Sequence, residues 1–226
     1  MESGTRATLS GMIELDAEQV RVLGCLLEKE RTVPDSYPMT LKGLVTACNQ
    51  SSNRFPVVAY DGATVQRTVD TLKDMGLVRF VHPSHGERTT KFRQVIDERL
   101  ALLPTEAAVL SVLFVRGAQT VAEIRARTER LHAFETTEEV VDALEGLARR
   151  DEALARPIER RPGEREGRWT HVFAQADAPA PTVPTDAADA PFPAARNALE
   201  TRIAELEAKV EHLYGILGEE PPPPSL

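Results

Sequence analysis

The spacing of apolar residues predicts helices at the start of the chain. A first helix begins at Asp16, where Gln19 three residues later completes a capping-box pattern. Its apolar face recurs at helical spacing and consists of Val20, Leu23, Leu26 and Leu27. A second, shorter helix is expected over residues 41–48, because Thr40 can cap its first turn.

The next segment predicts a third helix followed by a β-hairpin. The helix starts after Asp61-Gly62 and ends at Gly76. Its buried stripe consists of Val65, Val69 and Leu72. The runs 77–81 and 90–95 are typical of strands, and residues 83–86 have the composition of a turn. Three helices followed by a hairpin is the order of a winged-helix domain.

The same order then repeats along the chain. Helices are expected at 105–116, 120–130 and 136–150, and each opens at a threonine that can cap it. The second and third add a glutamate three residues after the threonine, which is a capping box. The runs 154–158 and 169–173 bracket a charged, Pro- and Gly-containing turn and predict a second hairpin. Two copies of one topology suit this chain length.

The C-terminal part has a different pattern. Residues 175–195 are rich in Ala, Pro and Asp and predict a semi-extended linker, and residues 196–218 step by four and three between apolar positions. This heptad seam consists of Leu199, Ile203, Leu206, Val210, Leu213 and Leu217. Branched residues at two of the a positions and leucine at the d positions favour a parallel two-stranded coiled coil, and hence a homodimer. The alternative is a single amphipathic helix that folds back onto the body.

These elements predict a mainly α fold with small β-hairpins, in the α+β class. It comprises two tandem winged-helix domains and a C-terminal coiled-coil helix. The parts are a flexible leader at 1–14, winged-helix domains at 15–100 and 101–174, the linker at 175–195, the coiled coil at 196–218 and a disordered tail at 219–226.

The charge distribution limits how the chain can meet nucleic acid. Its 226 residues include 27 Lys and Arg against 35 Asp and Glu, a net charge of −8. Residues 176–226 contain 3 basic and 9 acidic residues, so most of the acidity lies there. A basic coat for nucleic acid is therefore excluded, and any contact with double-stranded DNA requires a local patch.

Catalytic and targeting motifs are not found. The sequence contains no GxSxG, P-loop, HExxH or dinucleotide fingerprint, and its five histidines lack metal-ligand spacing. Cys25 and Cys48 have no CxxC or His partner and are expected to be small buried residues. We expect no enzyme activity, cofactor or metal. Without an apolar leader or a run long enough to span a bilayer, a cytoplasmic protein without membrane contact is expected.

The third helix of the first copy provides the best candidate for DNA contact, because this helix enters the major groove in winged-helix proteins. Asp70 and Asp74 lie nearby and oppose phosphate. The candidates on the outer helix face, the polar run before it and the hairpin are Asn53, Arg54, Thr64, Gln66, Arg67, Thr68, Thr71, Arg88 and Lys91. Arginine can pair with guanine and glutamine with adenine. The alternative is a solvated helix face with a polar loop.

The second copy is expected to behave differently. Its third helix carries carboxylates at Glu138, Glu139, Asp142 and Glu145, which oppose entry into a groove between phosphates. Its hairpin offers Arg160, Arg161, Arg165 and Arg168, offset by neighbouring glutamates. These arginines can contact phosphate or an acidic partner, or simply be solvated.

Several motifs resemble YceH-type bacterial proteins. They are RVLGCLLEK at 21–29, TVP and YP within 32–38, ACNQ, NR and PV within 47–57, RGAQT at 116–120, and RPGERE at 161–166 followed by His171 and Phe173. Phe55 departs from the pattern, which has an acidic residue there. The resemblance covers residues 13–174 and implies tandem winged helices with a C-terminal coil. The family is described as conserved and of unknown function, so the resemblance implies no activity.

Two hypotheses of function follow from the sequence. The first is a dimeric DNA-binding transcriptional regulator, which rests on the winged topology and on the face formed by Gln66, Arg67 and Thr68. The second is a protein-interaction or scaffold module, which rests on the net charge, the acidic helix of the second copy and the coiled tail.

Overall fold

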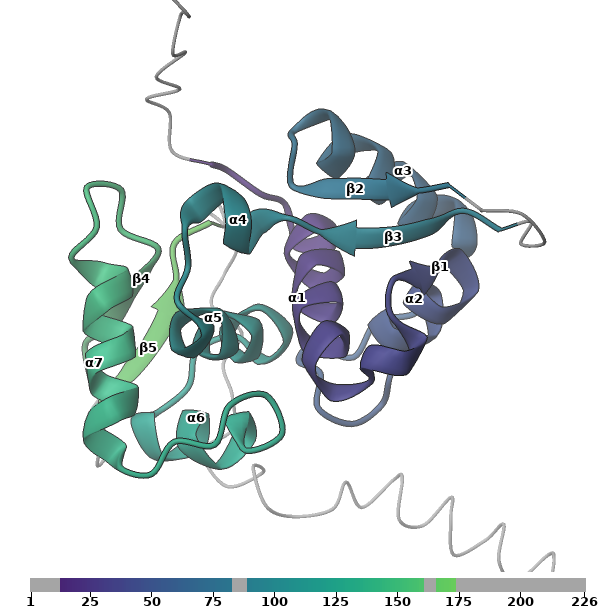
Figure 1. Ribbon diagram of the computed structural model, residues 1–226. Helices are drawn as coiled ribbons and strands as arrows, with labels where there is room; N and C mark the ends of the chain where they lie inside the picture. The colour runs from purple at the N-terminus through teal and green to yellow at the C-terminus, as the bar shows by residue number, and fades with distance from the viewer. Residues whose placement is uncertain (1–12, 83–88, 161–165, 174–226) are drawn as a thin grey trace, which may run out of the picture. The chain divides into compact units, whose positions relative to one another are not determined.

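The computed structural model describes residues 13–82, 89–160 and 166–173 (Figure 1). The expected linker, the coiled-coil helix with its seam at 199–217 and the tail lie outside the described residues. Among the described residues, no helix is long and apolar enough to cross a membrane.

The described residues form two successive sets of helices and strands. The first set is α1 (Ala17–Thr32), the 3-10 helix η1 (Pro34–Ser36), β1 (Met39–Thr40), α2 (Leu41–Cys48), α3 (Gly62–Asp74), β2 (Val78–Val81), β3 (Lys91–Gln94) and α4 (Ile96–Leu100). The second set is α5 (Pro104–Arg116), α6 (Val121–Thr128), α7 (Thr137–Ala148), β4 (Ala155–Ile158) and β5 (Arg168–His171). This is an α+β architecture, as the sequence predicts.

Most of the helices begin at a residue whose side chain caps the first turn. At α1 the expected capping box is present: the Gln19 amide donates to the Asp16 carboxylate at 2.8 Å, and Gln19 returns a bond to the Asp16 N–H at 2.9 Å. Thr40 caps α2 and Asp61 caps α3 through their side-chain oxygens. Thr120 caps α6 in a complete capping box. These caps satisfy backbone N–H groups that have no partner within the helix.

The start of α5 and the cap of α7 differ from the prediction. Thr105 is not a cap: α5 begins one residue earlier, because Pro104 fits the first helical position and Glu106 accepts the Leu103 N–H at 2.9 Å. Thr136 caps α7, but the expected box is incomplete. The carboxylate of Glu139 accepts the N–H of Glu135, one residue before the cap.

Two antiparallel sheets complete the two sets. In the first set the strand order is β1-β3-β2, and Phe92 of β3 lies between Met39 of β1 and Phe80 of β2. In the second set β4 pairs with β5, and a bridge joins Gln119 to Trp169 of β5. Gln119 directly precedes the cap of α6, just as β1 directly precedes α2. The second set therefore repeats the topology of the first.

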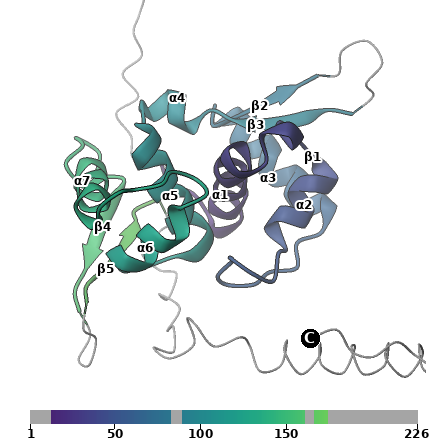
Figure 2. The same cartoon turned by 60° about the horizontal axis from the view of Figure 1, so that its bottom comes forward.

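Helices α1 and α5 join the two sets in one hydrophobic core. Both helices are largely buried, and they pack side by side (Figure 1, Figure 2). Gly24 permits the close approach, and the Ser111 hydroxyl on α5 donates to its carbonyl at 3.5 Å. The Leu15 N–H also donates to the Phe173 carbonyl at 2.7 Å, which ties the start of the first set to the end of the second. The two sets therefore share one body.

Because a histidine packs against this core, we expect the free energy of unfolding to depend on pH. The His171 ring packs edge-on against Phe114 with centroids 5.1 Å apart, and its Nδ1 is buried without a partner among the described residues. Burial lowers the pKa of His171 to about 4, from 6.5. The unfolded chain therefore binds the proton first as pH falls, so stability is complete above about pH 6.5 and declines toward pH 4.

We expect this decline to reach about 2–3 kcal/mol, a little less than full burial would give because the side chain keeps some exposure. Urea unfolding of the wild type and of His171→Phe at pH 7.5 and 4.5 measures it. The variant removes the titrating group and keeps an aromatic ring, so it should lose less stability between the two pH values. Equal losses in both proteins would contradict the assignment to His171.

Candidate functional site

Helix α3 has one face in the core and one in solvent. Val65, Val69 and Leu72 have no exposed surface, which confirms the predicted stripe. On the opposite side Arg67 and Thr71 are exposed. The face is held by local bonds, since Arg67 donates to the Thr64 hydroxyl at 3.2 Å and the Thr71 hydroxyl donates to the Arg67 carbonyl at 3.1 Å.

Three further residues of α3 were predicted to contact DNA. Two of them are half-buried and bonded to neighbouring residues, and the third is buried. Gln66 is half-buried and donates to Asp70 on the next turn at 3.1 Å. Thr64 is also half-buried, and its N–H donates to Asp61 at 2.7 Å. Thr68 was expected on the outer face, but it is only 5% exposed. Its hydroxyl donates to the Thr64 carbonyl at 2.9 Å, and α1 covers it, so Thr68 is not available to DNA.

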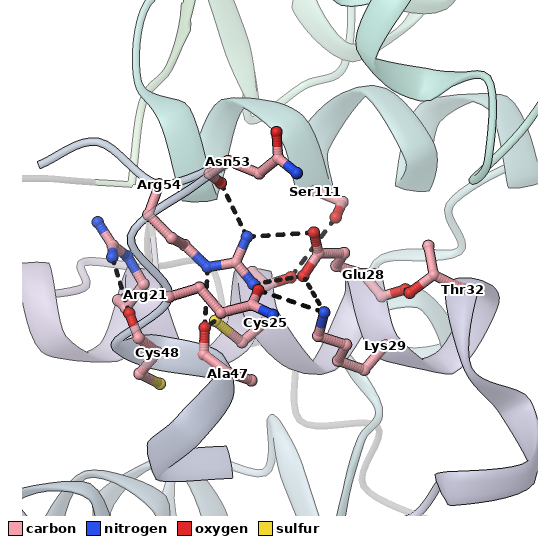
Figure 3. A network of polar contacts seen from close by, with 12 residues as sticks. Arg21, Cys25, Glu28, Lys29, Thr32, Ala47, Cys48, Asn53, Arg54 and Ser111 are labelled. Atoms are coloured by element: carbon pink, nitrogen blue, oxygen red, sulfur yellow. Dashed lines mark hydrogen bonds and ion pairs between the residues drawn. The ribbon is translucent and has the colours of Figure 1, made fainter. Parts of the chain in front are cut away.

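Arg54 corrects the prediction for the polar run that precedes α3. It is 5% exposed, and its guanidinium donates to the Ala47 carbonyl at 2.9 Å and to the Glu28 carboxylate (Figure 3). Burial raises the pKa of Glu28, but the hydrogen bond and charge of Arg54 outweigh it and leave the pKa lowered. The pair is therefore ionised inside the protein, and Arg54 is not a DNA contact.

The rest of the polar run also bonds to the body of the protein. We call residues 49–56 the strap. The Phe55 N–H donates to the Val115 carbonyl on α5 at 2.8 Å, and Asn53, although exposed, accepts from Arg116. Asn49 closes the strap through two bonds to the backbone of Tyr60. The strap thus bridges α1, α2 and α5.

The hairpin of the first set carries cations with carboxylate partners. Arg79 lies 3.5 Å from Glu98, and Arg93 pairs with the same carboxylate. Lys73 of α3 lies over the Phe80 ring at 4.9 Å. Lys91, a predicted contact, is half-buried at the start of β3. The predicted Arg88 lies outside the described residues.

In the second set, carboxylates on α7 are exposed, as the sequence predicts. An arginine of the hairpin, by contrast, is bound within the protein. On α7, Glu138 and Asp142 are exposed, while Glu145 pairs with Arg149. Arg168 was a candidate for phosphate contact, but it binds the Glu123 carboxylate at 2.9 Å and the Ala118 carbonyl at 3.3 Å, and so anchors β5 to α6. Arg160 is exposed. Arg161 and Arg165 lie outside the described residues.

Two hollows in the surface differ in the residues that line them. One of about 370 Å³ lies between α6 and the start of α7, with Ala122, Ala126 and Phe134 among its lining residues. Another of about 500 Å³ contains Arg99, Arg150 and other charged residues near the end of α7. Arg150 already donates to the Leu100 carbonyl and to Glu106. Within the described ranges no three His, Cys, Asp or Glu side chains are placed to hold a metal ion.

Comparison with known proteins finds relatives over most of the chain. A family model described as "Protein of unknown function, DUF480" matches residues 15–164. A UPF0502 protein of Koribacter versatilis (strain Ellin345) is 40% identical over 200 residues, which cover 88% of this chain and 90% of that protein. These matches confirm the resemblance to YceH-type proteins.

Proposed function

The chain belongs to the DUF480 (UPF0502) family, and we propose that it is a tandem winged-helix protein that binds double-stranded DNA through α3. The order α1-β1-α2-α3-β2-β3 with sheet order β1-β3-β2 supports a winged helix in the first set. The Gln119–Trp169 bridge supports the same arrangement in the second. In winged-helix proteins the third helix reads the major groove.

The exposed face of α3 is the observation that carries this proposal. Arg67 stands at its centre, and among the described residues its guanidinium contacts the Thr64 hydroxyl and no carboxylate within ion-pair distance. It is therefore able to donate two hydrogen bonds to a guanine edge. Thr71 lies one turn further along, and its methyl group can contact thymine.

Exposed lysines on α2 and α3 can neutralise phosphate. Lys42, which the sequence analysis did not single out, is exposed in the first turn of α2, and Lys73 is exposed near the end of α3. Asp70 and Asp74 are exposed on the same helix and reduce the attraction. We therefore expect moderate affinity with a steep dependence on salt. A dimer through residues 196–218 remains part of this proposal.

DNA binding by fluorescence anisotropy tests the proposal. The full chain should bind mixed-sequence duplexes at about 50 mM salt, and the affinity should fall linearly with the logarithm of salt concentration. Arg67→Ala should weaken binding about tenfold, because it removes the groove contact. The matched control is Arg156→Ala, which removes an exposed arginine from β4 and should change affinity less than about twofold.

Absence of binding at low salt would contradict the proposal. So would equal losses in the two arginine variants, because that result would indicate attraction to net charge rather than contact by α3. Partial unfolding of the Arg67 variant is not expected, since the side chain is exposed and its loss leaves no buried group without a partner.

A second candidate function, a protein-interaction module, is favoured by the surface of α7. Glu138 and Asp142 are exposed there. The hollow beside the start of α7 is lined by Ala122, Ala126, Ala133 and Phe134, together with Thr137, Glu129 and Arg125, and Arg125 donates to the Glu135 carbonyl at 2.7 Å. Apolar lining beside carboxylates suits a basic amphipathic segment of a partner. This function becomes the better explanation if the chain fails to bind DNA and charge reversal at Glu138 and Asp142 abolishes capture of a defined partner.

A further inference from the structure

Three exposed side chains form the outer ridge of α3. Arg67, Asp70 and Asp74 are spaced by three and four residues, so they follow one line along the helix. This line lies on the side opposite the buried apolar stripe. In a winged helix whose third helix enters the major groove, the outer ridge is the part of the protein nearest to the bases. It presents one guanidinium group and two carboxylates.

Asp70 has no evident task in the fold. Its carboxylate is exposed, and no cation of the described residues lies within ion-pair distance of it. Lys73, three residues further along, lies over the Phe80 ring at 4.9 Å. In the described part of the chain the carboxylate accepts from the Gln66 amide, one turn earlier, at 3.1 Å. Gln66 therefore holds Asp70 in place without neutralising it and leaves the second carboxylate oxygen able to accept.

A carboxylate on a helix that enters the major groove is selective, because it can only accept hydrogen bonds. Guanine and thymine present acceptors in this groove and repel it, whereas cytosine presents the N4 amino group, which donates. Adenine presents a donor beside the N7 acceptor and is the poorer partner. The phosphates repel the carboxylate as well. Its cost is therefore best offset where a cytosine amino group lies opposite it.

We propose that α3 selects duplexes with two consecutive G·C base pairs, where Arg67 donates to guanine and Asp70 accepts from the cytosine amino group of the neighbouring pair. This selectivity rests on the proposed binding of DNA by α3. Three residues of helix rise by about 4.5 Å and adjacent base pairs are about 3.4 Å apart, so the two side chains reach neighbouring pairs. Asp70 is then a specificity-determining residue, and Gln66 is a positioning residue that acts through it.

Fluorescence anisotropy with duplexes of defined composition tests the selectivity. The full chain should bind a G·C duplex that contains GG, GC and CG steps about tenfold or more tightly than an A·T duplex of equal length at the same salt concentration. A duplex with inosine in place of guanine keeps every donor and acceptor of the major groove and lacks only the guanine amino group of the minor groove. It should bind as tightly as the G·C duplex.

Asp70→Asn and Asp74→Asn form a matched pair of variants, since each removes one exposed carboxylate from α3. Asp74 is the last residue of α3, farthest from the N-terminal part with which recognition helices contact bases. Both variants should bind all duplexes more tightly, because repulsion of phosphate is reduced. Only Asp70→Asn should also lower the ratio of G·C to A·T affinity, by about fivefold. Gln66→Ala should lower this ratio without the general gain in affinity, since it removes no charge.

The possible failures of this experiment are distinguishable. Absence of binding to every duplex would contradict the proposed function and the selectivity with it. Equal affinity for the G·C and A·T duplexes would overturn the selectivity and leave the proposed function standing. So would weaker binding of the inosine duplex, which indicates reading of the minor groove, or equal ratios in the two aspartate variants. Both variants should fold, because the aspartates are exposed and neither caps the helix.

Discussion

Glu28→Ala is expected to lower the free energy of unfolding by about 3–5 kcal/mol, because it leaves the charge of Arg54 buried without a partner. The Arg54 side chain has no exposed surface, and that of Glu28 is only 14% exposed. Water therefore cannot replace the lost carboxylate without opening the strap. Urea unfolding at neutral pH measures the loss, and the variant should also show a lower melting temperature.

A surface pair provides the matched control for this prediction. Glu98 is 53% exposed and pairs with Arg79 and Arg93 on the hairpin, so Glu98→Ala should cost less than about 1 kcal/mol. The double variant Glu28→Leu with Arg54→Met should recover much of the stability, because it removes both buried charges. If Glu28→Ala costs no more than Glu98→Ala, the pair does not hold the strap.

The strap shows what local sequence patterns could not predict. Six consecutive polar residues before α3 indicated a loop in front of a DNA-reading helix, whereas the structure uses them to bridge α1, α2 and α5. The partners lie far along the chain: Arg54 meets Glu28, and Phe55 meets Val115. A signal was present on α1, where Arg21 and Glu28 lie two turns apart beside a largely apolar face. Charges at such positions indicate buried partners.

Helices with polar caps could be predicted from the sequence because a cap is local chemistry. Asp16, Thr40 and Asp61 each bond to a backbone N–H three residues ahead. The two-residue strand β1 was missed, because it exists only through pairing with β3 about fifty residues later. Helix α4 was also missed, because it has only five residues and no side-chain cap by which a local pattern could predict it.

The candidate site could be predicted in part, because helical periodicity, like a helix cap, is a local property of the sequence. A helical period of 3.6 residues placed Arg67 and Thr71 in solvent correctly, because these positions lie opposite the apolar stripe. Thr68 lies at the edge of that stripe, where its exposure depends on a neighbouring helix. Glu18 of α1 lies 3.3 Å from its hydroxyl, a contact fifty residues away in the chain. Edge positions of a helix are therefore the ones at which pattern and structure diverge.

Gly24→Leu is expected to lower the free energy of unfolding by about 3 kcal/mol or more, because α1 and α5 leave no room for a side chain there. A Cβ at Gly24 would lie 2.7 Å from the Phe114 Cβ and 2.8 Å from a Val115 methyl carbon. The Phe114 backbone carbon would be 3.3 Å away, so side-chain rotation alone cannot relieve the contact. Gly24→Ala should cost about 1–3 kcal/mol, although alanine is the better helix former by about 1 kcal/mol.

Gly62→Ala separates crowding from the general effect of replacing glycine in a helix. Gly62 lies in the first turn of α3, and a Cβ there would meet nothing within 4 Å, so the change should be neutral or stabilise by up to about 1 kcal/mol. Thermal and urea unfolding of the three variants measure the difference. Because α1 and α5 share one core, Gly24→Leu should lower a single transition for both sets. If one set melts before the other, or if Gly24→Ala matches Gly62→Ala, the two sets are less tightly joined than this contact requires.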